Sequence, residues 1–384
     1  MEKKSNYRNI PKFIFIADNL RVGGIQRLLL DESYWLIEKD MSITIATLSK
    51  SIEFDDIIEI DKNFPLTREL DIRFAGESKF EQIRFVARLV KSYAGPVTIV
   101  SHSTSGAFIG RLGSLLSLRN VKVSLYIHQV LTLSDREQRI KRLAQSLFAH
   151  NVYVSSMQFK LSWDEHVAKS KIWSLIFRKK INFDRMGVYL PRLMWSGWEK
   201  ISPCATSVPH LIFMSRVTAW KGVTEFLRIC ENNISNGLHA IVVTTRNAGE
   251  AMLGSGNFVN QNHHLVSESG ATTFNWPKGS VHIYPTNYGA ETKYPQSIGI
   301  NVLEFLALGI PSMISKEGFE SWPELSESLL VCVCDWKSNT DINNHIEKLE
   351  LITTEQVEEE LQRILPFISI EAHGQNLLSL LSES

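Results

Sequence analysis

Residues 296–315 read Gln-Ser-Ile-Gly-Ile-Asn-Val-Leu-Glu-Phe-Leu-Ala-Leu-Gly-Ile-Pro-Ser-Met-Ile-Ser. The apolar spacing and the two glycines predict a helix that begins near Gly299 and ends at Gly309. The apolar residues after Pro311 predict a short strand at 312–315. A helix that leads directly into a strand is the repeating unit of a parallel α/β sheet, so this stretch favours a doubly wound α/β fold.

The same alternation recurs on both sides of this stretch. In the second half we expect further strands at 211–214, 240–244 and 281–284, with a long surface loop at 254–279, where no periodicity is present. In the first half we expect a helix at 25–39 and strands at 13–17, 43–48, 97–100, 121–128 and 152–154. Three prolines between residues 191 and 209 interrupt the pattern, which predicts two domains, 1–200 and 201–384. We expect residues 371–384 to form a last helix that packs back across the domains.

The composition is that of an ordinary globular protein. The chain has 384 residues, of which 44% are hydrophobic and 21% charged, and this excludes a disordered tail, a collagen-like fibre or a simple coiled coil. No apolar run reaches the roughly 18 residues that a membrane-spanning helix needs. The first residues, Met-Glu-Lys-Lys-Ser-Asn-Tyr-Arg, lack the apolar core of a signal peptide, so we expect a soluble cytoplasmic protein.

The net charge of zero conceals an asymmetry between the halves. Residues 1–200 hold 31 Lys and Arg against 21 Asp and Glu, whereas residues 201–384 hold 10 against 20. One interpretation is two solvated domains that attract each other. The other is that the first half lies against an anionic partner, such as a phospholipid surface or a diphosphate-bearing acceptor. We expect no nucleic-acid partner, because none of the usual recognition motifs is present.

Three stretches carry the candidate chemistry. The helix predicted to begin near Gly299 would offer free backbone amides to a phosphate, and Glu304 would lie where a carboxylate can accept both hydroxyls of a ribose. The loop after strand 211–214 holds Arg216 and Lys221, two cations suited to a diphosphate. Each stretch also has an ordinary structural interpretation, as a helix before a strand or as solvated cations at a turn.

The third stretch is the loop after the first strand, where Gly23 and Gly24 allow a ligand to approach the helix start closely. The loop does not fit the pattern G-x-G-x-x-G, so a dinucleotide-dependent dehydrogenase is disfavoured. A plain tight turn into a helix is the alternative.

Taken together, the three stretches resemble the retaining glycosyltransferases of family 4, which have the GT-B architecture of two facing Rossmann-like doubly wound parallel-sheet domains. The strand, Gly-Gly and helix pattern is met by residues 13–30, and the Gly-Arg and Lys-Gly pattern by Arg216 and Lys221-Gly222, with Ser215 in place of the glycine. The E-x7-E pattern is met by Gln296 and Glu304, with the following Ala-Leu-Gly-Ile-Pro run. The order and spacing agree over most of the chain.

The resemblance implies a role for each matching residue. Arg216 and Lys221 would hold the diphosphate of a nucleotide sugar, and Glu304 would hold its ribose. Backbone amides at Gly299 and Ile300, and at Gly23 and Gly24, would lie near the phosphates. His128 matches the first-domain histidine beside the donor sugar, and His102 is a weaker candidate for the acceptor side. Gln296 stands where the family has a glutamate that contacts the donor sugar, and an amide keeps hydrogen bonds but not the charge.

The resemblance implies sugar transfer from a nucleotide-diphosphate sugar, with retention of configuration, to a saccharide or lipid-linked acceptor, as in the synthesis of bacterial surface polysaccharide such as lipopolysaccharide or capsule. We expect neither a metal nor a further cofactor, and peripheral association with the inner face of the plasma membrane. Two alternatives remain open at this point. One is a nucleotide-sugar 2-epimerase, and the other is a non-catalytic protein that binds a nucleotide sugar or a partner, which the replacement at Gln296 would suit.

Overall fold

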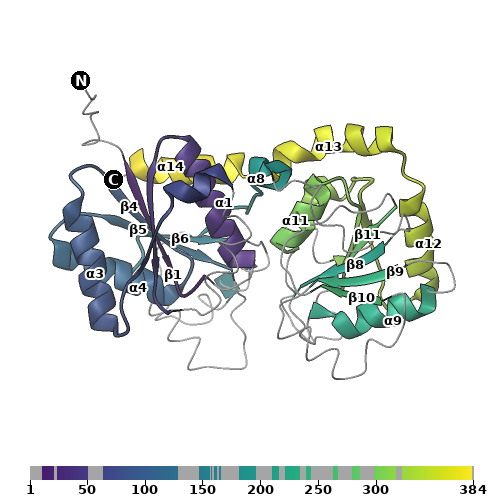
Figure 1. Ribbon diagram of the computed structural model, residues 1–384, viewed down its shortest axis with the longest axis horizontal. Coiled ribbons are helices and arrows are strands. Elements are labelled where there is room, and N and C mark those ends of the chain that lie inside the picture. Colours follow the sequence, from purple (N-terminus) through teal and green to yellow (C-terminus); the bar gives the residue numbers. More distant parts are fainter. Residues whose placement is uncertain are drawn as a thin grey trace. The chain divides into compact units, whose positions relative to one another are not determined.

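The computed structural model places the chain in two compact units, each of which is an α/β sandwich (Figure 1). Unit 1 comprises residues 1–186 and 370–384, and unit 2 comprises residues 187–369. The structure describes residues 11–20, 24–50, 64–128, 147–155, 157, 160–161, 164–165, 181–195, 210–215, 221–233, 239–243, 263–266, 279–285, 298–316 and 322–382.

The sheet of unit 1 has seven parallel strands in the order β3-β2-β1-β4-β5-β6-β7. Their bounds are β1 Lys12–Ala17, β2 Ser42–Thr47, β3 Asp71–Phe74, β4 Val97–Ser101, β5 Lys122–Ile127, β6 Asn151–Val154 and β7 Ile181–Phe183. The expected strands are confirmed to within a residue or two, whereas β3 and β7 lie where the sequence indicated none. Both are short edge strands, which bury too few side chains to show a pattern.

The helices of unit 1 cover both faces of its sheet. Their bounds are α1 Gly24–Glu38, η2 Pro65–Glu69, α3 Lys79–Ser92, α4 Thr104–Ser117 and α14 Glu371–Ser382. Helices α3 and α4 pack together on one face, and α1 and α14 pack together on the other (Figure 1). Each helix on the first face begins at a serine whose hydroxyl accepts a hydrogen bond from a backbone amide of the first turn.

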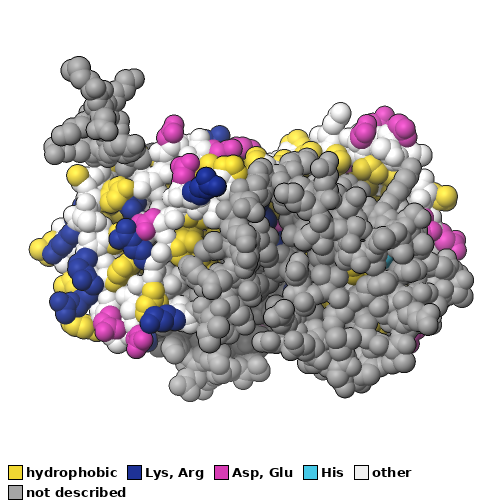
Figure 2. All heavy atoms as spheres, viewed as in Figure 1, with side chains coloured by type: hydrophobic (Ala, Val, Ile, Leu, Met, Phe, Trp, Pro, Cys, Tyr) yellow, Lys and Arg dark blue, Asp and Glu magenta, His cyan; other side chains and the backbone are white. Residues whose placement is uncertain are grey.

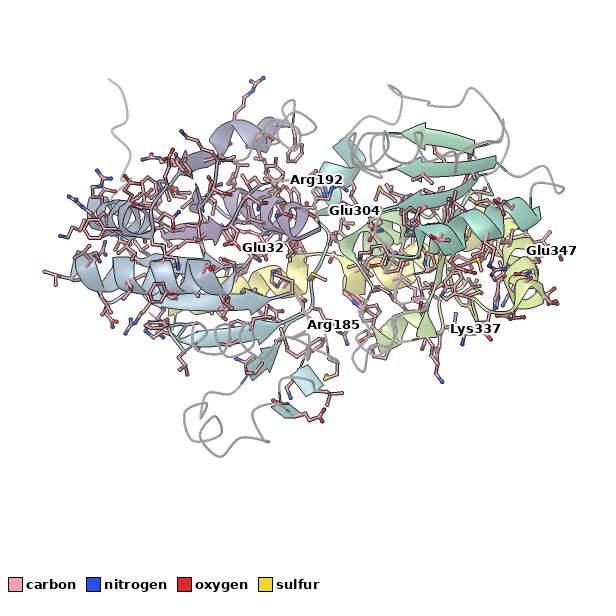
Figure 3. The ribbon with its side chains drawn as sticks, turned by 90° about the horizontal axis from the view of Figure 1, so that it is seen from below. Glu32, Arg185, Arg192, Glu304, Lys337 and Glu347 are labelled. Atoms are coloured by element: carbon pink, nitrogen blue, oxygen red, sulfur yellow. The ribbon has the colours of Figure 1, made fainter. Side chains whose placement is uncertain are left out.

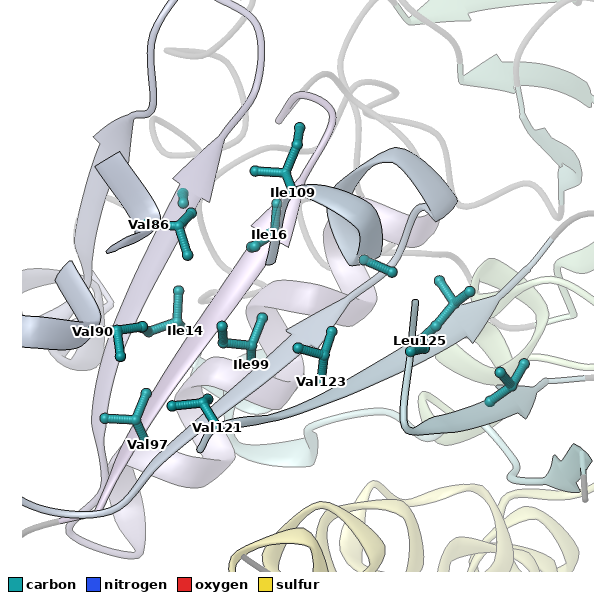
Figure 4. Close-up of a cluster of buried hydrophobic side chains, with 14 of the residues drawn as sticks. Ile14, Ile16, Val86, Val90, Val97, Ile99, Ile109, Val121, Val123 and Leu125 are labelled. Atoms are coloured by element: carbon teal, nitrogen blue, oxygen red, sulfur yellow. The ribbon is translucent and has the colours of Figure 1, made fainter. Parts of the chain in front are cut away.

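The core of unit 1 follows from the alternation of side chains along its strands. Ile14 and Ile16 point to the face covered by α3 and α4, where they pack with Val86, Ile99 and Val123 (Figure 4). Phe13 and Phe15 alternate with them and are fully buried. On the same face as α14, ten consecutive residues of α1, from Leu28 to Ile37, are buried, including Asp31 and Glu32. A helix enclosed on all sides in this way places charged groups inside the protein.

The sheet of unit 2 has six parallel strands in the order β10-β9-β8-β11-β12-β13. The strands are β8 His210–Met214, β9 His239–Val243, β10 His263–Val266, β11 Val281–Tyr284, β12 Ser312–Ile314 and β13 Val331–Val333. The helices are α8 Leu190–Trp195, α9 Val223–Asn233, α11 Ile300–Ala307, η7 Pro323–Leu325, α12 Asn339–Glu350 and α13 Thr354–Ile368. The expectation of a loop throughout 254–279 is wrong, because β10 lies within it; its pairing with β9 supplies backbone hydrogen bonds that no side-chain pattern reveals.

The division between the units differs from the expected one at its boundary, whereas the last helix packs back onto the first unit as expected. The first expected domain ended at residue 200, but residues from Gly187 onward, including α8, belong to unit 2. The last helix, α14, belongs to unit 1 and packs against α1 and β4. Both placements follow from burial. Leu193 of α8 packs in the apolar cluster of unit 2 with α11 and α13, and Gly374 of α14 lies so close to the Trp35 ring that an added Cβ would approach it to 2.6 Å.

One buried histidine makes unit 2 sensitive to acid. His282 of β11 has no exposed surface, its ring stacks 4.2 Å from that of Phe305, and its Nδ1 lies 3.2 Å from the Ser312 hydroxyl. Burial lowers the pKa of His282 to about 3, whereas an unfolded histidine takes up its proton near pH 6.5. The unfolded state therefore binds more protons between these values, and the stability of unit 2 falls as pH falls through this window.

We expect His282→Phe, which keeps an aromatic ring at this position, to weaken that dependence by up to about 1.4 kcal/mol per pH unit. The measurement is urea unfolding of both proteins at several pH values between about 4 and 7, followed by a probe in unit 2. An unchanged slope in the variant would show that His282 is not the group responsible.

Candidate functional site

The most developed site in unit 2 lies at the carboxyl end of its strands. Lys221 follows β8, and its Nζ donates a hydrogen bond to the Tyr284 hydroxyl at 3.2 Å, with the ammonium 5.4 Å from the centre of the same ring. Gly299 is the N-cap of α11. Asn301, in the first turn of α11, donates from its side chain to the backbone carbonyl of Met214, the last residue of β8, at 2.7 Å. A cation, a hydroxyl and the first turn of a helix thus converge at one sheet edge.

A side chain at Gly299 would have to displace the ends of two neighbouring side chains. An added Cβ there would lie 2.5 Å from the Asn301 side-chain oxygen and 2.9 Å from the Tyr284 hydroxyl. The first amides of a helix have no partners within it, and they carry the positive end of the helix dipole. Glycine therefore lets an anion approach these amides, and Lys221 adds a full positive charge beside them. This geometry suits a phosphate or diphosphate group.

Gly222 shapes the turn that brings Lys221 to this edge. Its φ is +77°, and an added Cβ would lie 2.4 Å from the backbone oxygen of Pro285, which follows β11. The loops after β8 and β11 are therefore in contact at Gly222 and Pro285, where Gly222 has no side chain to separate the two backbones. Backbone atoms cannot move aside as a side chain can, so the contact requires glycine.

We expect Gly222→Ala to lower the free energy of unfolding by about 1–3 kcal/mol, because it adds both left-handed strain and overlap with backbone. Gly299→Ala is the matched control. Its φ is −84° and its nearest neighbours are ends of side chains, so a cost below about 1 kcal/mol is expected. Denaturant unfolding compares the two, and equal costs would contradict the assignment of strain to Gly222.

Glu304 lies inside unit 2, in an ion pair. Its carboxylate has no exposed surface, and Oε1 accepts a hydrogen bond from Arg192 Nη2 at 3.0 Å; the Arg192 side chain is 2% exposed (Figure 3). Arg192 comes from α8, at the start of unit 2. The carboxylate expected to hold a ribose is thus placed in the second turn of α11, and one of its oxygens is engaged by a buried guanidinium. The role of Glu304 toward a ribose stays a prediction.

The carboxyl edge of unit 1 brings together a second set of candidate residues. Gly24 begins α1 after β1, His102 follows β4, and His128 follows β5. Strands β1 and β4 are neighbours from which the strand order runs in opposite directions, and ligands of doubly wound sheets bind at such a point. His102 Nδ1 and His128 Nε2 are 2.8 Å apart, and the two rings stack 5.1 Å from centre to centre. The two histidines named from the sequence are therefore direct partners.

The protonation of these side chains is set by burial and by a carboxylate. Desolvation lowers the pKa of His128 to about 3, with a further lowering from His102, so the ring is neutral at physiological pH. His102 Nε2 lies 2.8 Å from the Glu32 carboxylate. Burial of Glu32 opposes its ionisation, but His102 and His373 outweigh this and lower the pKa of Glu32 to about 2. Glu32 is therefore an anion that contacts His102, which in turn contacts His128.

Several residues of the candidate site were visible in the sequence, and others were not. Gly23, Arg216 and Gln296 lie outside the described residues, so their roles stay predictions. Six further residues were not anticipated from the sequence. They are Tyr284, Asn301, Arg192, Glu32, His373 and Asp184, which follows β7 and contacts His373. Glu32 alone had a signal, since Asp31-Glu32 interrupts an otherwise apolar helix. Arg192 and His373 are single polar residues that only the tertiary structure pairs with distant carboxylates.

The two Rossmann-like parallel-sheet units define a protein of the GT-B fold class. Of the solved structures, Alr3699/HepE of Anabaena, in complex with UDP and glucose, superposes with a TM-score of 0.67 at 12% identity, covering 97% of this chain and 100% of that one. A glycosyltransferase of Rickettsia africae gives a TM-score of 0.67 at 13% identity, covering 98% and 99%. An α-glucosyltransferase in complex with UDP and a DNA 13-mer containing an HMU base gives 0.67 at 12%, covering 97% and 99%.

At these identities the superpositions show the fold alone. No protein-family model matches the sequence, and no curated protein matches it either. Within the described residues, no helix is long and apolar enough to cross a lipid bilayer.

Proposed function

We propose that this protein is a glycosyltransferase that moves a sugar from a nucleotide-diphosphate sugar, specifically a UDP-sugar, to a hydroxyl group of a saccharide or lipid-linked acceptor. The observation that carries the proposal is the group formed by Lys221, Tyr284 and the N-terminus of α11 at the carboxyl edge of unit 2. A GT-B fold supports it, and the choice of UDP is supported by the UDP and UDP-glucose bound to similarly folded proteins.

The chemistry follows a retaining route without a protein nucleophile. The acceptor oxygen bonds to the anomeric carbon on the face from which the diphosphate departs, the bond from that carbon to the β-phosphate oxygen breaks, and the acceptor proton passes to the phosphate. Negative charge grows on the leaving diphosphate during this step. In this scheme Lys221 and the amides of α11 stabilise that charge, and Arg216, which lies outside the described residues, is proposed to act with them. The scheme requires no metal ion.

Thermal unfolding with UDP-, GDP-, ADP-, CMP- and dTDP-sugars tests donor binding. A ligand that binds only the folded state adds about 2.7 kcal/mol at 100 times its dissociation constant. We expect stabilisation by UDP-sugars, weaker stabilisation by the others, and loss of the effect in Lys221→Met. Absence of stabilisation by every donor in a folded protein would overturn the proposal.

The non-catalytic alternative rests on Gln296, which replaces a carboxylate of the family pattern by an amide. Turnover by a Gln296→Glu variant separates the two cases. A large increase would indicate a site that has lost activity, and a decrease would indicate a site adapted to a particular donor.

For the acceptor, we propose a membrane-bound saccharide lipid, because unit 1 carries an exposed face that is both basic and apolar. On α3, Phe80 is 65% exposed, and the Arg84 guanidinium lies 5.4 Å from its ring centre. Arg88 and Lys91 of α3 are also exposed, and on the neighbouring α4 and its C-cap Leu115, Leu116 and Leu118 are exposed. Figure 2 shows Lys, Arg and apolar side chains interspersed on this face. Basic residues attract anionic lipid headgroups by about 1 kcal/mol each, and the apolar groups can enter the interface.

Sedimentation with vesicles of anionic and of zwitterionic phospholipid tests this surface. We expect binding to anionic vesicles at low salt, release at high salt, and at least about tenfold weaker binding in Arg84→Glu/Arg88→Glu. Lys337→Glu, an exposed change in unit 2, is the control. No binding of the wild type at low salt would overturn the proposal, and so would preferential binding to duplex DNA, which would point instead to a nucleic-acid acceptor.

A further inference from the structure

Unit 1 contains a buried chain of ionisable side chains that ends at His128. From His128 the chain passes to His102, to the Glu32 carboxylate on α1, to His373 on α14, and to Asp184 after β7. The successive distances are 2.8 Å, 2.8 Å, 2.6 Å and 2.9 Å. The side chains of His102, Glu32, His373 and Asp184 are at most 3% exposed. Five groups from five segments of the sequence thus form one continuous network.

The deep end of the network fixes the charge of its members. His373 lies between two carboxylates, with Nε2 toward Glu32 and Nδ1 toward Asp184. Burial alone would lower the pKa of His373, but Asp184 and Glu32 outweigh it and raise the pKa to about 10. Both ring nitrogens of His373 therefore donate. Asp184 accepts further hydrogen bonds from the Tyr126 hydroxyl at 3.0 Å and the Asn376 amide at 2.8 Å.

The hydrogen-bonding pattern propagates from Glu32 toward the sheet edge. Glu32 Oε2 and His102 Nε2 are 2.8 Å apart, a close ion contact rather than an aligned hydrogen bond. A carboxylate has only lone pairs to offer at this distance, so Nε2 is the His102 nitrogen that carries a proton. With a single proton on His102, the other nitrogen, Nδ1, is an acceptor and receives a hydrogen bond from His128 Nε2–H, whereas a doubly protonated His102 would donate to His128 Nε2 and reverse the pattern. The remaining nitrogen of His128, Nδ1, consequently has a free lone pair. It is shielded from solvent and has no hydrogen-bond partner among the described residues.

We propose that Glu32 and His102 are positioning residues that hold His128 in its Nε2–H tautomer, so that His128 Nδ1 presents a hydrogen-bond acceptor to a hydroxyl of the bound sugar or acceptor. The identity of that hydroxyl-bearing ligand rests on the proposed function, whereas the tautomer does not. Among the described residues, the titratable groups that face the two histidines are Glu32, Tyr126 and, through Glu32, His373, and the Phe15 ring also stacks on His102. The last helix, α14, thereby influences His128 at the sheet edge, because His373 of α14 donates a hydrogen bond to Glu32.

The isosteric variant Glu32→Gln should invert the pattern. Since His373 donates from Nε2 to one oxygen of Glu32, it will retain the amide oxygen of glutamine there and turn the amide nitrogen toward His102. The amide then donates to His102 Nε2, His102 donates from Nδ1 to His128 Nε2, and the proton of His128 moves to Nδ1. The acceptor at the end of the network becomes a donor.

The test is NMR of the full-length protein labelled with ¹⁵N in histidine, without ligand, because the two tautomers differ in their ring ¹⁵N signals. The His128 signals are identified by their loss in His128→Gln. We expect the Nε2–H form in the wild type, the Nδ1–H form in Glu32→Gln, and the wild-type form in Asp184→Asn, which alters the far side of His373. An Nδ1–H or charged His128 in the wild type overturns the proposal, as does an unchanged tautomer in folded Glu32→Gln.

Kinetics then ask whether the tautomer matters to a reaction. Where a nucleotide sugar is turned over, Glu32→Gln should lower kcat about tenfold, as expected for one reversed hydrogen bond to the reacting ligand, with an altered pH profile. Asp184→Asn should leave both nearer to wild type. If no nucleotide sugar binds, the proposed function fails while the tautomer result stands; if the tautomer changes and kcat does not, the role toward the ligand is refuted.

Discussion

Replacing Arg192 by methionine is expected to lower the free energy of unfolding of unit 2 by about 3–5 kcal/mol. The Arg192 guanidinium and the Glu304 carboxylate are 2% and 0% exposed, and they are 3.0 Å apart. Removing the arginine leaves a carboxylate inside the protein without its positive partner. Desolvation of an unpaired charge costs much more than the pair itself contributes, because water no longer reaches the carboxylate.

Hydrogen exchange in increasing urea is the measurement, followed in peptides from residues 298–314, which contain α11 and β12. The double variant Arg192→Met/Glu304→Gln should recover most of the loss, since it removes both charges. Arg363→Met is the matched control. Arg363 is 39% exposed and its partner Glu360 is 7% exposed, so the Glu360 carboxylate keeps more contact with water than Glu304 does, and its loss of the arginine should cost less than the loss of Arg192. A double variant as unstable as the single one would show that the cost does not come from the orphaned carboxylate.

Replacing Lys221 by methionine is expected to lower kcat for sugar transfer by about 10²–10³, with a smaller change in KM. The reason is that charge on the leaving diphosphate grows as its bond to the sugar breaks, so a fixed cation there acts more strongly on the transition state than on the bound donor. Methionine keeps much of the length of the side chain and removes its charge and its hydrogen bond to Tyr284.

The initial rate of transfer with a UDP-sugar, measured across donor concentrations, gives kcat and KM separately. Lys337→Met, at an exposed position in unit 2 (Figure 3), is the control and should match the wild type. Unfolding of the Lys221 variant should stay within about 0.5 kcal/mol of wild type, which separates lost catalysis from lost structure. A kcat within a factor of a few of wild type would remove Lys221 from the catalytic machinery.

Much of the fold could be predicted from the sequence because most of its strands and helices produce recognisable local patterns of apolar residues. Buried parallel strands appear as short apolar runs, and helices such as α1 and α11 appear as longer periodic segments bounded by glycine. The helix expected to begin near Gly299 does begin there, with Gly299 as its N-cap. Strands β3, β7, β10 and β13 were not anticipated. All four are the edge strands of their sheets, and a short edge strand takes its stability from pairing with its one neighbour more than from its own side-chain pattern.

The residues of the candidate site also form two groups, those that the sequence predicts and those that only the folded structure brings together. The sequence predicts that glycines and a cation lie at the carboxyl ends of particular strands, because in a parallel sheet those loops must share one edge. Only the tertiary structure decided that Arg192 meets Glu304 and that His128 is joined through His102, Glu32 and His373 to Asp184. Those pairings span up to 341 residues. These pairs form because each charged side chain is buried away from water and would be destabilising without a partner. Burial is a property of the folded chain, so the local sequence does not reveal it.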